Sequence, residues 1–313
     1  MTAPDLSFIA PPLEVSDWRM VLLVSAATDA GLLQSLPGRA DDLAGRLGLH
    51  EHAVTVVLEA LARYGVVEVD GDGTYRSGPT APGADSAATL HHHARALRQW
   101  ALTLDGRLRG DPVSADGAQH DPERWIDSLA VNARRIAPTS IDACLNRLPA
   151  SKTVLDLGGG HGVYAAEFAR RGLAATMQDR PVMVEIARRR GELEPAGVEL
   201  FAGDFFDELA PGPFDLVFCS GVTNTFDGES NLRLYERIRS CLASDGWLVI
   251  QTSMRDRQPV AALFGVQMLV VGHGGDAHPE GLYRRWLAVS GYGPAEVIDV
   301  DDGRRSLLFA PVA

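Results

Sequence analysis

The second half of the chain alternates short apolar runs with helical stretches, and this pattern limits the possible folds more than any other feature. The apolar runs cover residues 153–157, 174–177, 198–201, 216–219 and 248–252. Runs of this length separated by helices predict a parallel sheet that is covered by helices on both faces. Residues 295–309 then predict a closing antiparallel hairpin, which departs from a nicotinamide-binding Rossmann domain. We therefore predict a Rossmann-like α/β domain over residues 151–313, with a mostly parallel seven-stranded sheet.

The first part of the chain has a different pattern. Helical periodicity over residues 18–36, 41–48 and 50–64 precedes a hairpin around the Asp-Gly-Asp-Gly turn at 70–73. Three helices followed by a hairpin indicate a winged-helix domain, which we assign to residues 1–85. Residues 86–150 are predicted to form a helical connector that contributes to a substrate pocket, with a kink or boundary at Pro138.

The distribution of charge argues against DNA as a partner of the winged helix. The whole chain carries a formal charge of −12, and residues 1–80 hold five arginines against eleven acidic residues, a net of −6. Phosphate anchoring uses roughly 6–10 contacts from basic side chains, which this segment does not supply. We therefore expect the N-terminal domain to serve packing or dimerisation.

The spacing of the cysteines and the length of the apolar runs indicate the cellular compartment. The three cysteines lie far apart without a Cys-x-x-Cys spacing, so neither a disulfide framework nor a metal site is predicted. Residues 1–12 lack the basic start and apolar run of a secretory signal, and no run approaches the roughly 18 apolar residues of a membrane span. These features lead us to expect a soluble, cytoplasmic protein.

The strongest local motif covers residues 154–162, Val-Leu-Asp-Leu-Gly-Gly-Gly-His-Gly, which runs from a strand that contains Asp156 into a glycine-rich turn. Gly158 and Gly160 would let a ligand approach the backbone closely. Taken alone, this motif also fits any tight turn between a strand and a helix.

Acidic residues after the next two strands raise the value of that turn. Asp179 lies 21 residues after Gly158, near the offset at which a carboxylate binds ribose hydroxyls. Asp204 and Phe205 follow the third strand, where they could bind the amino group and the ring of adenine. Both aspartates could instead cap the turns that follow them. With all three elements in order, the pattern favours a site for S-adenosyl-L-methionine (SAM), with Ser220 beneath the sulfonium.

Taken together, these motifs resemble a family of small-molecule methyltransferases that fuse a winged-helix dimerisation domain to a class I SAM-binding domain. Residues 27–75 resemble the dimerisation module, and the segments that match the SAM-binding domain are residues 155–162, 178–181, 203–206 and 272–283. The resemblance implies SAM as cofactor, a small-molecule substrate from natural-product metabolism, and a homodimer formed through the N-terminal domain. It implies neither a nucleic-acid nor a membrane partner.

The chain departs from this family at the position of the general base. Family O-methyltransferases usually carry a His-Asp-Trp triplet soon after the fourth strand, and the matching stretch here is residues 221–227, with Asn224 in place of the histidine. An amide cannot act as a general base near neutral pH. We expect Asn224 to orient the acceptor by hydrogen bonding during in-line methyl transfer.

Three explanations of this departure stay open. His273, His161 or one of His91–His93 could act as the base, whereas His278 is predicted to cap the helix that begins at Pro279. Alternatively the acceptor needs no base, as for a neutral amine, an acidic phenol or an electron-rich carbon, because positioning alone contributes roughly 7–11 kcal/mol. The chain could also bind SAM for cyclisation or hydroxylation. A SAM-sensing winged-helix regulator is a further alternative, which the acidic charge disfavours.

Overall fold

The computed structural model describes residues 17–112, 122–257, 259–271, 274–301 and 303–313. The chain divides into two compact units, residues 1–98 and 99–313, with the division inside the long helix α4 (Ala84–Leu108). The predicted domain limits at residues 85 and 150 stay predictions.

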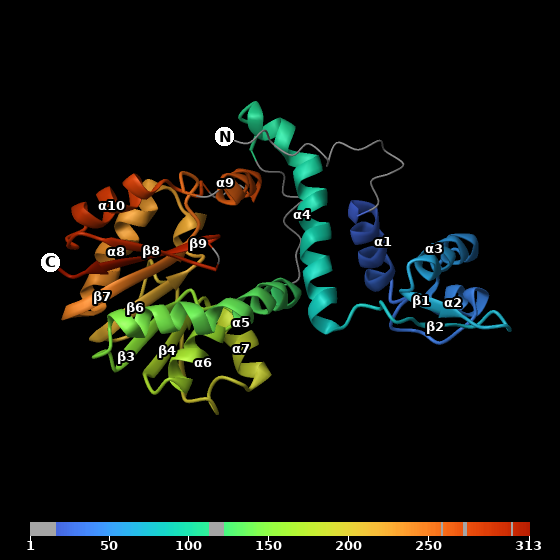
Figure 1. Ribbon diagram of the computed structural model, residues 1–313, viewed down its shortest axis with the longest axis horizontal. Helices are drawn as coiled ribbons and strands as arrows, with labels where there is room; N and C mark the ends of the chain where they lie inside the picture. The colour runs from blue at the N-terminus through green and yellow to red at the C-terminus, as the bar shows by residue number, and fades with distance from the viewer. Residues whose placement is uncertain (1–16, 113–121, 258, 272–273, 302) are drawn as a thin grey trace. The chain divides into compact units, whose positions relative to one another are not determined.

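The first unit has the expected order of three helices and a hairpin. Helices α1 (Asp17–Asp29), α2 (Ala40–Leu47) and α3 (Glu51–Arg63) precede the antiparallel strands β1 (Val67–Val69) and β2 (Tyr75–Ser77) (Figure 1). The imidazole of His50 accepts a hydrogen bond from the Ala53 amide and caps α3. Leu43, Leu58 and Leu61 are fully buried and form the centre of this unit's own core.

The second unit contains the predicted seven-stranded sheet. Its strands lie in the order β5 (Val198–Ala202), β4 (Ala174–Asp179), β3 (Thr153–Leu157), β6 (Phe214–Ser220), β7 (Leu242–Thr252), β9 (Arg305–Pro311) and β8 (Glu296–Val300). The strands from β5 to β7 are parallel, and β9 pairs antiparallel with both β7 and β8. The predicted fold class is therefore confirmed. The strand order reverses next to β3, because β4 and β5 lie on one side of it and β6 and β7 on the other. Sheets of this kind bind ligands in the crevice at the reversal, which here lies between β3 and β6.

Helices cover both faces of this sheet, as Figure 1 shows. One face packs against α5 (Pro122–Arg147), α6 (Val163–Arg170) and α7 (Pro181–Arg190), and the other against α8 (Gly228–Cys241) and α10 (Glu280–Val289). Alternation within the strands serves both cores: Val154 and Phe218 face the first, and Leu155 and Val217 the second.

Helix α5 continues through Pro138, so a helix boundary at this proline is wrong, while the kink expected as the other possibility stays a prediction. Ile136, Ala137 and Ile141 around it are buried in the sheet core, and this packing offsets the hydrogen bond that proline cannot donate. None of the helices within the described ranges is both long and apolar enough to cross a bilayer.

Helix α9 (Pro259–Val271) is almost entirely apolar and contacts the C-terminal part of α4. Trp100 of α4 donates a hydrogen bond to Gln267, and the Arg107 Nε donates to the Leu269 carbonyl at 3.0 Å.

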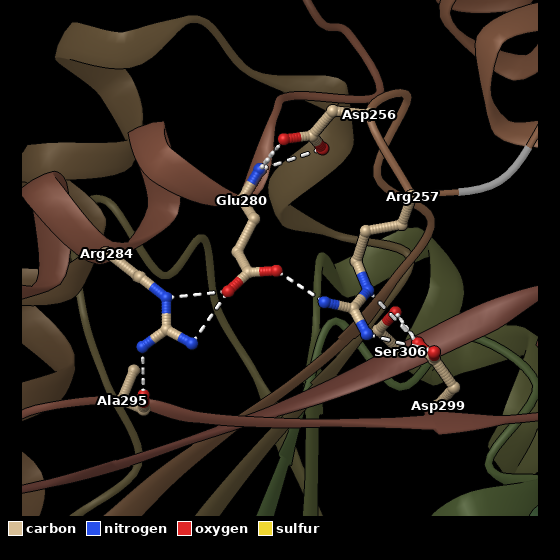
Figure 2. Close-up of polar contacts among 7 residues, drawn as sticks. All are labelled: Asp256, Arg257, Glu280, Arg284, Ala295, Asp299 and Ser306. Atoms are coloured by element: carbon tan, nitrogen blue, oxygen red, sulfur yellow. Dashed lines mark hydrogen bonds and ion pairs between the residues drawn. The ribbon is translucent and has the colours of Figure 1, made fainter.

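The segment between β7 and α9 is held by an ion-pair network (Figure 2). There, Arg257 binds Glu280 at 2.5 Å and Asp299 at 2.9 Å, which joins the start of α10 to β8.

Candidate active site

The predicted cofactor residues meet at the carboxyl ends of β3, β4, β5 and β6. Asp156 pairs in register with Phe218 of β6, so the glycine-rich turn after β3 lies beside the end of β6. Asp179 ends β4 and pairs with Ala202 of β5, which brings the segment after β5 next to Asp179. The structure thus gathers the predicted motifs along one edge of the sheet.

The glycine-rich turn cannot carry side chains at its critical positions. Gly158 has a φ of 71°, and a Cβ atom there would lie 2.5 Å from the Cγ2 of Val222. Gly160 has a φ of 47°, and a Cβ atom there would lie 3.8 Å from the Oδ2 of Asp179. A side chain at 160 would therefore fill the space beside this carboxylate, which glycine leaves to a ligand.

The Asp179 carboxylate suits the ribose of a nucleoside ligand. It is 8% exposed, and it accepts hydrogen bonds from the amides of Gly160 at 2.9 Å and Arg180 at 2.7 Å. Burial raises the pKa of Asp179, while the two amides favour its ionised form. Each oxygen accepts one described bond and retains a lone pair for a hydroxyl group. These residues therefore fit a SAM ribose.

Asp156 supports the turn from beneath. It is 1% exposed, and its Oδ2 accepts a hydrogen bond from the Ala165 amide in the first turn of α6. Burial raises the pKa of Asp156 to about 7, and the nearby Asp179 contributes to that increase. Its described contact is with protein backbone, so any direct role in cofactor binding stays a prediction.

The predicted adenine residues lie in the loop after β5. Asp204 is exposed, and its Oδ1 accepts a hydrogen bond from the Phe206 amide at 2.9 Å, which is the capping contact considered as an alternative. Phe205 is 9% exposed and packs edge-to-face on Phe226, with 5.9 Å between ring centroids. Contacts of Asp204 and Phe205 with adenine stay predictions.

Ser220, at the end of β6, belongs to a polar cluster that sequence reasoning missed. The Gln251 Nε2 donates hydrogen bonds to the Ser220 Oγ at 2.9 Å and to the Tyr164 Oη at 2.7 Å. Gln251 is fully buried and Tyr164 is 3% exposed. The available signal was an amide side chain at the end of the apolar strand 248–252.

Asn224 lies in the short 3-10 helix Thr223–Thr225, between β6 and α8, and is 3% exposed. Its Nδ2 lies 3.4 Å from the Sδ of Met268 on α9, and its carbonyl accepts a hydrogen bond from the Asp276 amide at 3.0 Å. Within the described ranges, no titratable side chain hydrogen-bonds to the Asn224 side chain. The described contact of this amide is therefore the Met268 sulfur, which cannot act as a base.

The histidines proposed as substitute bases have different surroundings. His273 lies outside the described residues. The His161 Nδ1 accepts a hydrogen bond from the Val163 amide, and burial with nearby arginines lowers the pKa of His161 to about 4, which makes it a weak base. His91 belongs to the first unit, where its Nδ1 lies 3.6 Å from the Oδ1 of Asp29.

His278 does not cap α10, contrary to the expectation. Pro279 occupies the N-cap position, and the ring of His278 turns inward, where it is 6% exposed. The His278 Nε2 lies 2.8 Å from the Phe226 carbonyl, and since a carbonyl only accepts, this nitrogen carries the proton. Burial lowers the pKa of His278. Its ring is therefore a hydrogen-bond donor to the loop that carries Asn224.

Comparisons with known proteins agree with this geometry. A family model described as a methyltransferase domain matches residues 129–291. The chain is 27% identical over 308 residues to the mitomycin biosynthesis 6-O-methyltransferase of Streptomyces lavendulae, with 86% of each chain covered. It is also 27% identical over 286 residues to the tetracenomycin polyketide synthesis 8-O-methyltransferase TcmO of Streptomyces glaucescens, with 83% of each covered.

A solved structure has the same fold. The mitomycin 7-O-methyltransferase MmcR aligns with a TM-score of 0.77 at 24% identity, and the alignment covers 95% of both chains. The family model spans more than half of this chain, and the sheet order and glycine-rich turn are those expected of a SAM-binding domain. The chain therefore belongs to the methyltransferase domain family, which confirms the predicted SAM-dependent methyltransferase.

Proposed function

We propose that the protein methylates a hydroxyl oxygen on an aromatic natural product, and that this hydroxyl is acidic enough to ionise without a base from the protein. Two relatives that each match more than four-fifths of the chain are named as O-methyltransferases of mitomycin and tetracenomycin biosynthesis. Their names support oxygen as the acceptor atom and natural-product metabolism as the context.

The observation that carries this proposal is the side chain of Asn224. Its Nδ2 donates hydrogen bonds but cannot accept a proton, and its described contact is the sulfur of Met268. A thioether is a weak acceptor, so an anionic oxygen would replace it favourably. An acceptor that binds as an anion can accept a hydrogen bond from this amide, whereas a neutral alcohol would still need a base to remove its proton.

The shape of the surroundings favours a planar acceptor. Met268 belongs to α9, whose neighbouring residue Gln267 accepts a hydrogen bond from the indole of Trp100. Aromatic rings and methionine make favourable contacts with flat apolar ligands. We therefore place the acceptor between the Asn224 amide and the apolar surface formed by α9 and Trp100.

We propose further roles for the remaining residues of the site. The turn at Gly158 and Gly160 and the Asp179 carboxylate hold the donor, with Asp204 and Phe205 at its adenine and Ser220 near its reactive end. SAM held there would supply the methyl group: the acceptor oxygen would attack the methyl carbon in line, so that a carbon–oxygen bond would form, the carbon–sulfur bond would break and S-adenosylhomocysteine would leave. The acceptor loses its proton to solvent beforehand. Asn224 orients the oxyanion, and positioning of this kind contributes roughly 7–11 kcal/mol.

Two probe acceptors of different acidity test the proposal. Purified protein is incubated at pH 7 with SAM and either 2-hydroxy-1,4-naphthoquinone, an acidic enol, or 1-naphthol, an ordinary phenol. We expect methyl ether and S-adenosylhomocysteine to form in equal amounts from the hydroxyquinone, and 1-naphthol to react only as the pH rises toward its own pKa. Equal turnover of both probes at pH 7 would show that the protein supplies a base.

A variant separates this mechanism from one in which His273 acts as the base. If positioning alone operates, His273→Ala retains kcat for the hydroxyquinone within about threefold. A loss of about 100-fold or more would instead assign the base to His273, since general-base catalysis contributes roughly 10²–10⁴-fold. Failure to bind S-adenosylhomocysteine in calorimetry would refute the donor site itself.

The homodimer expected through the N-terminal domain is a separate proposal. Four large apolar side chains of the first unit are between 43% and 53% exposed, and they are Trp18, Val56, Tyr64 and Val69. Exposed apolar surface of this kind supports an interface. Light scattering of the full chain should give twice the mass of 33.6 kDa, whereas a monomeric mass would refute the dimer.

A further inference from the structure

Several backbone carbonyls of the loop that carries Asn224 accept hydrogen bonds from side chains. It runs from Gly221 to Asp227, between β6 and α8. The carbonyls of Thr223, Phe226 and Asp227 all accept hydrogen bonds from one atom, the Nδ2 of Asn231. The three distances are 2.9, 3.1 and 2.9 Å, and because an amide NH₂ has two hydrogens, one hydrogen is shared between two carbonyls. This single amide group connects the 3-10 helix at Thr223 to the residues that lead into α8.

Asn231 lies in the first turns of α8 and is fully buried. Its Oδ1 has no hydrogen-bond partner among the residues that the structure describes, so this buried amide oxygen is unsatisfied by them. Burying an unpaired carbonyl costs free energy that an apolar residue at this position would avoid. What the asparagine provides in return is its NH₂ group, which binds three backbone carbonyls of the loop.

A second set of contacts holds the loop from the opposite direction. The Asp276 amide donates to the Asn224 carbonyl at 3.0 Å, and the His278 ring donates to the Phe226 carbonyl at 2.8 Å. Gly275 approaches so closely that a Cβ atom there would lie 2.2 Å from the Asn224 carbonyl oxygen. The Asn224 backbone is therefore held between α8 and the segment that leads into α10.

We propose that Asn231 is a positioning residue for the methyl acceptor, because it fixes the loop from which Asn224 reaches the acceptor oxygen. This inference rests on the proposed function, since it assigns Asn231 to the acceptor half of the reaction. A displacement of about 1 Å in a positioned group can reduce the rate by about 100-fold. Loss of the three hydrogen bonds is expected to produce a displacement of that order.

The structure offers a matched control in a second buried amide. Gln178 is also fully buried, and its Nε2 donates to the carbonyls of Gly203 and Glu208 at 3.3 and 2.7 Å. Its Oε1 accepts from the Ala210 amide at 2.9 Å. Gln178 thus ties down the loop after β5, on the adenine side, as Asn231 ties down the loop after β6. Replacement of Gln178 should therefore affect binding of the methyl donor, and replacement of Asn231 should affect methylation of the acceptor.

The experiment compares Asn231→Leu with Gln178→Leu in the full chain. We measure affinity for S-adenosylhomocysteine by calorimetry, and kcat and KM with 2-hydroxy-1,4-naphthoquinone at saturating SAM. Asn231→Leu should lower kcat by about 100-fold and leave S-adenosylhomocysteine affinity within about threefold of wild type. Gln178→Leu should weaken that affinity by about tenfold with a smaller effect on kcat. If both variants weaken the affinity equally, Asn231 only supports the fold and the proposal fails.

A third variant distinguishes the donor group from the shape of the side chain. Asn231→Asp keeps the shape but sets a carboxylate against three carbonyl oxygens, so kcat should fall as in Asn231→Leu at pH 8. Because a protonated carboxyl can donate one of the lost bonds, the ratio of its kcat to that of wild type should rise as the pH falls toward 6. A ratio that stays flat, or a wild-type kcat at pH 8, would overturn the role of the donor.

Hydrogen exchange keeps the inference testable without turnover. Amides of residues 222–228 should exchange faster in Asn231→Leu than in wild type, while those of residues 203–210 should not change. If wild type does not methylate the hydroxyquinone, the proposed acceptor class fails, but the exchange of these two segments still decides whether Asn231 fixes the loop. Unchanged exchange at residues 222–228 would contradict the proposal.

Discussion

Replacing Asp156 by Asn is expected to change the pH dependence of stability. The carboxyl is 1% exposed, and burial raises its pKa from 3.8 to about 7. Between these values the folded protein holds a proton that the unfolded chain has released. The stability that this group contributes is therefore complete below about pH 4 and is lost as the pH rises to about 7. A shift of about three units corresponds to about 4 kcal/mol.

Asparagine keeps the acceptor for the Ala165 amide but has no proton to lose. The free energy of unfolding of Asp156→Asn, relative to wild type, should therefore increase by about 3 kcal/mol between pH 5 and pH 8, with no further change above pH 8. Urea unfolding followed by circular dichroism at several pH values measures this difference.

Asp215 provides a control of opposite electrostatics. Its Oδ2 accepts hydrogen bonds from the amides of Lys152 and Thr153, and these bonds lower its pKa. The stabilisation from its ionised form is complete above pH 4 and is lost only at lower pH, so Asp215→Asn should show a constant difference from wild type between pH 5 and pH 8. If the difference for Asp156→Asn were equally constant, the buried carboxyl would be ionised throughout, and the reasoning would be refuted.

Three further substitutions test other parts of the site. Asp179→Asn should weaken S-adenosylhomocysteine binding by about 10- to 100-fold in calorimetry, because hydrogen bonds to a charged group contribute about 1.5–3 kcal/mol. Gly275→Ala should lower kcat at nearly constant affinity for S-adenosylhomocysteine, because its methyl group would collide with the Asn224 carbonyl at 2.2 Å. Arg257→Met should lower the free energy of unfolding by about 1 kcal/mol, measured in urea, because its ion pairs with Glu280 and Asp299 are partly exposed.

Each of these substitutions has its own control. Asp72→Asn in the first unit should leave S-adenosylhomocysteine affinity unchanged, so an equal loss there would contradict a specific role for Asp179. Gly281→Ala adds a methyl group with no atom within 4 Å, and a matching loss of kcat would show that the collision at 275 is not the cause. The effect of Arg257→Met should shrink in 1 M salt, and an effect that does not depend on salt would exclude its ion pairs.

The sequence predicted the parts of the site that lie at the ends of strands. The Gly158 turn and Asp179 each follow an apolar run, and parallel strands bring such positions to one edge of the sheet. Strand β7 begins at Leu242, six residues before the predicted start. The prediction missed these residues because the polar Ser244 and Asp245 interrupt the apolar pattern of the strand. The internal position of Pro138 in α5 depends on tertiary packing, which no local rule contains.

The buried amides were not predicted as parts of the site, for a related physical reason. Gln178 binds backbone carbonyls 25 and 30 residues away in the sequence, and Asn231 binds carbonyls of the loop just before α8. A carbonyl has no sequence signature, so the partner of a buried amide cannot be read from residue types. His278 was placed at a helix cap for the same reason, since its acceptor is the backbone of Phe226, 52 residues away in the sequence.

The contact between Val222 and Gly158 has a consequence for how such an enzyme changes its substrates. A Cβ atom on Gly158 would lie 2.5 Å from a methyl group of Val222. The donor turn at Gly158 and the acceptor loop at Val222 therefore pack closely against each other. A larger side chain at position 222 would displace both the donor turn and the acceptor loop. Substitutions in the two segments should therefore combine non-additively. An attempt to broaden acceptor range by random mutagenesis would have to alter the two segments as a pair, whereas α9 and α4 could diverge without that coupling.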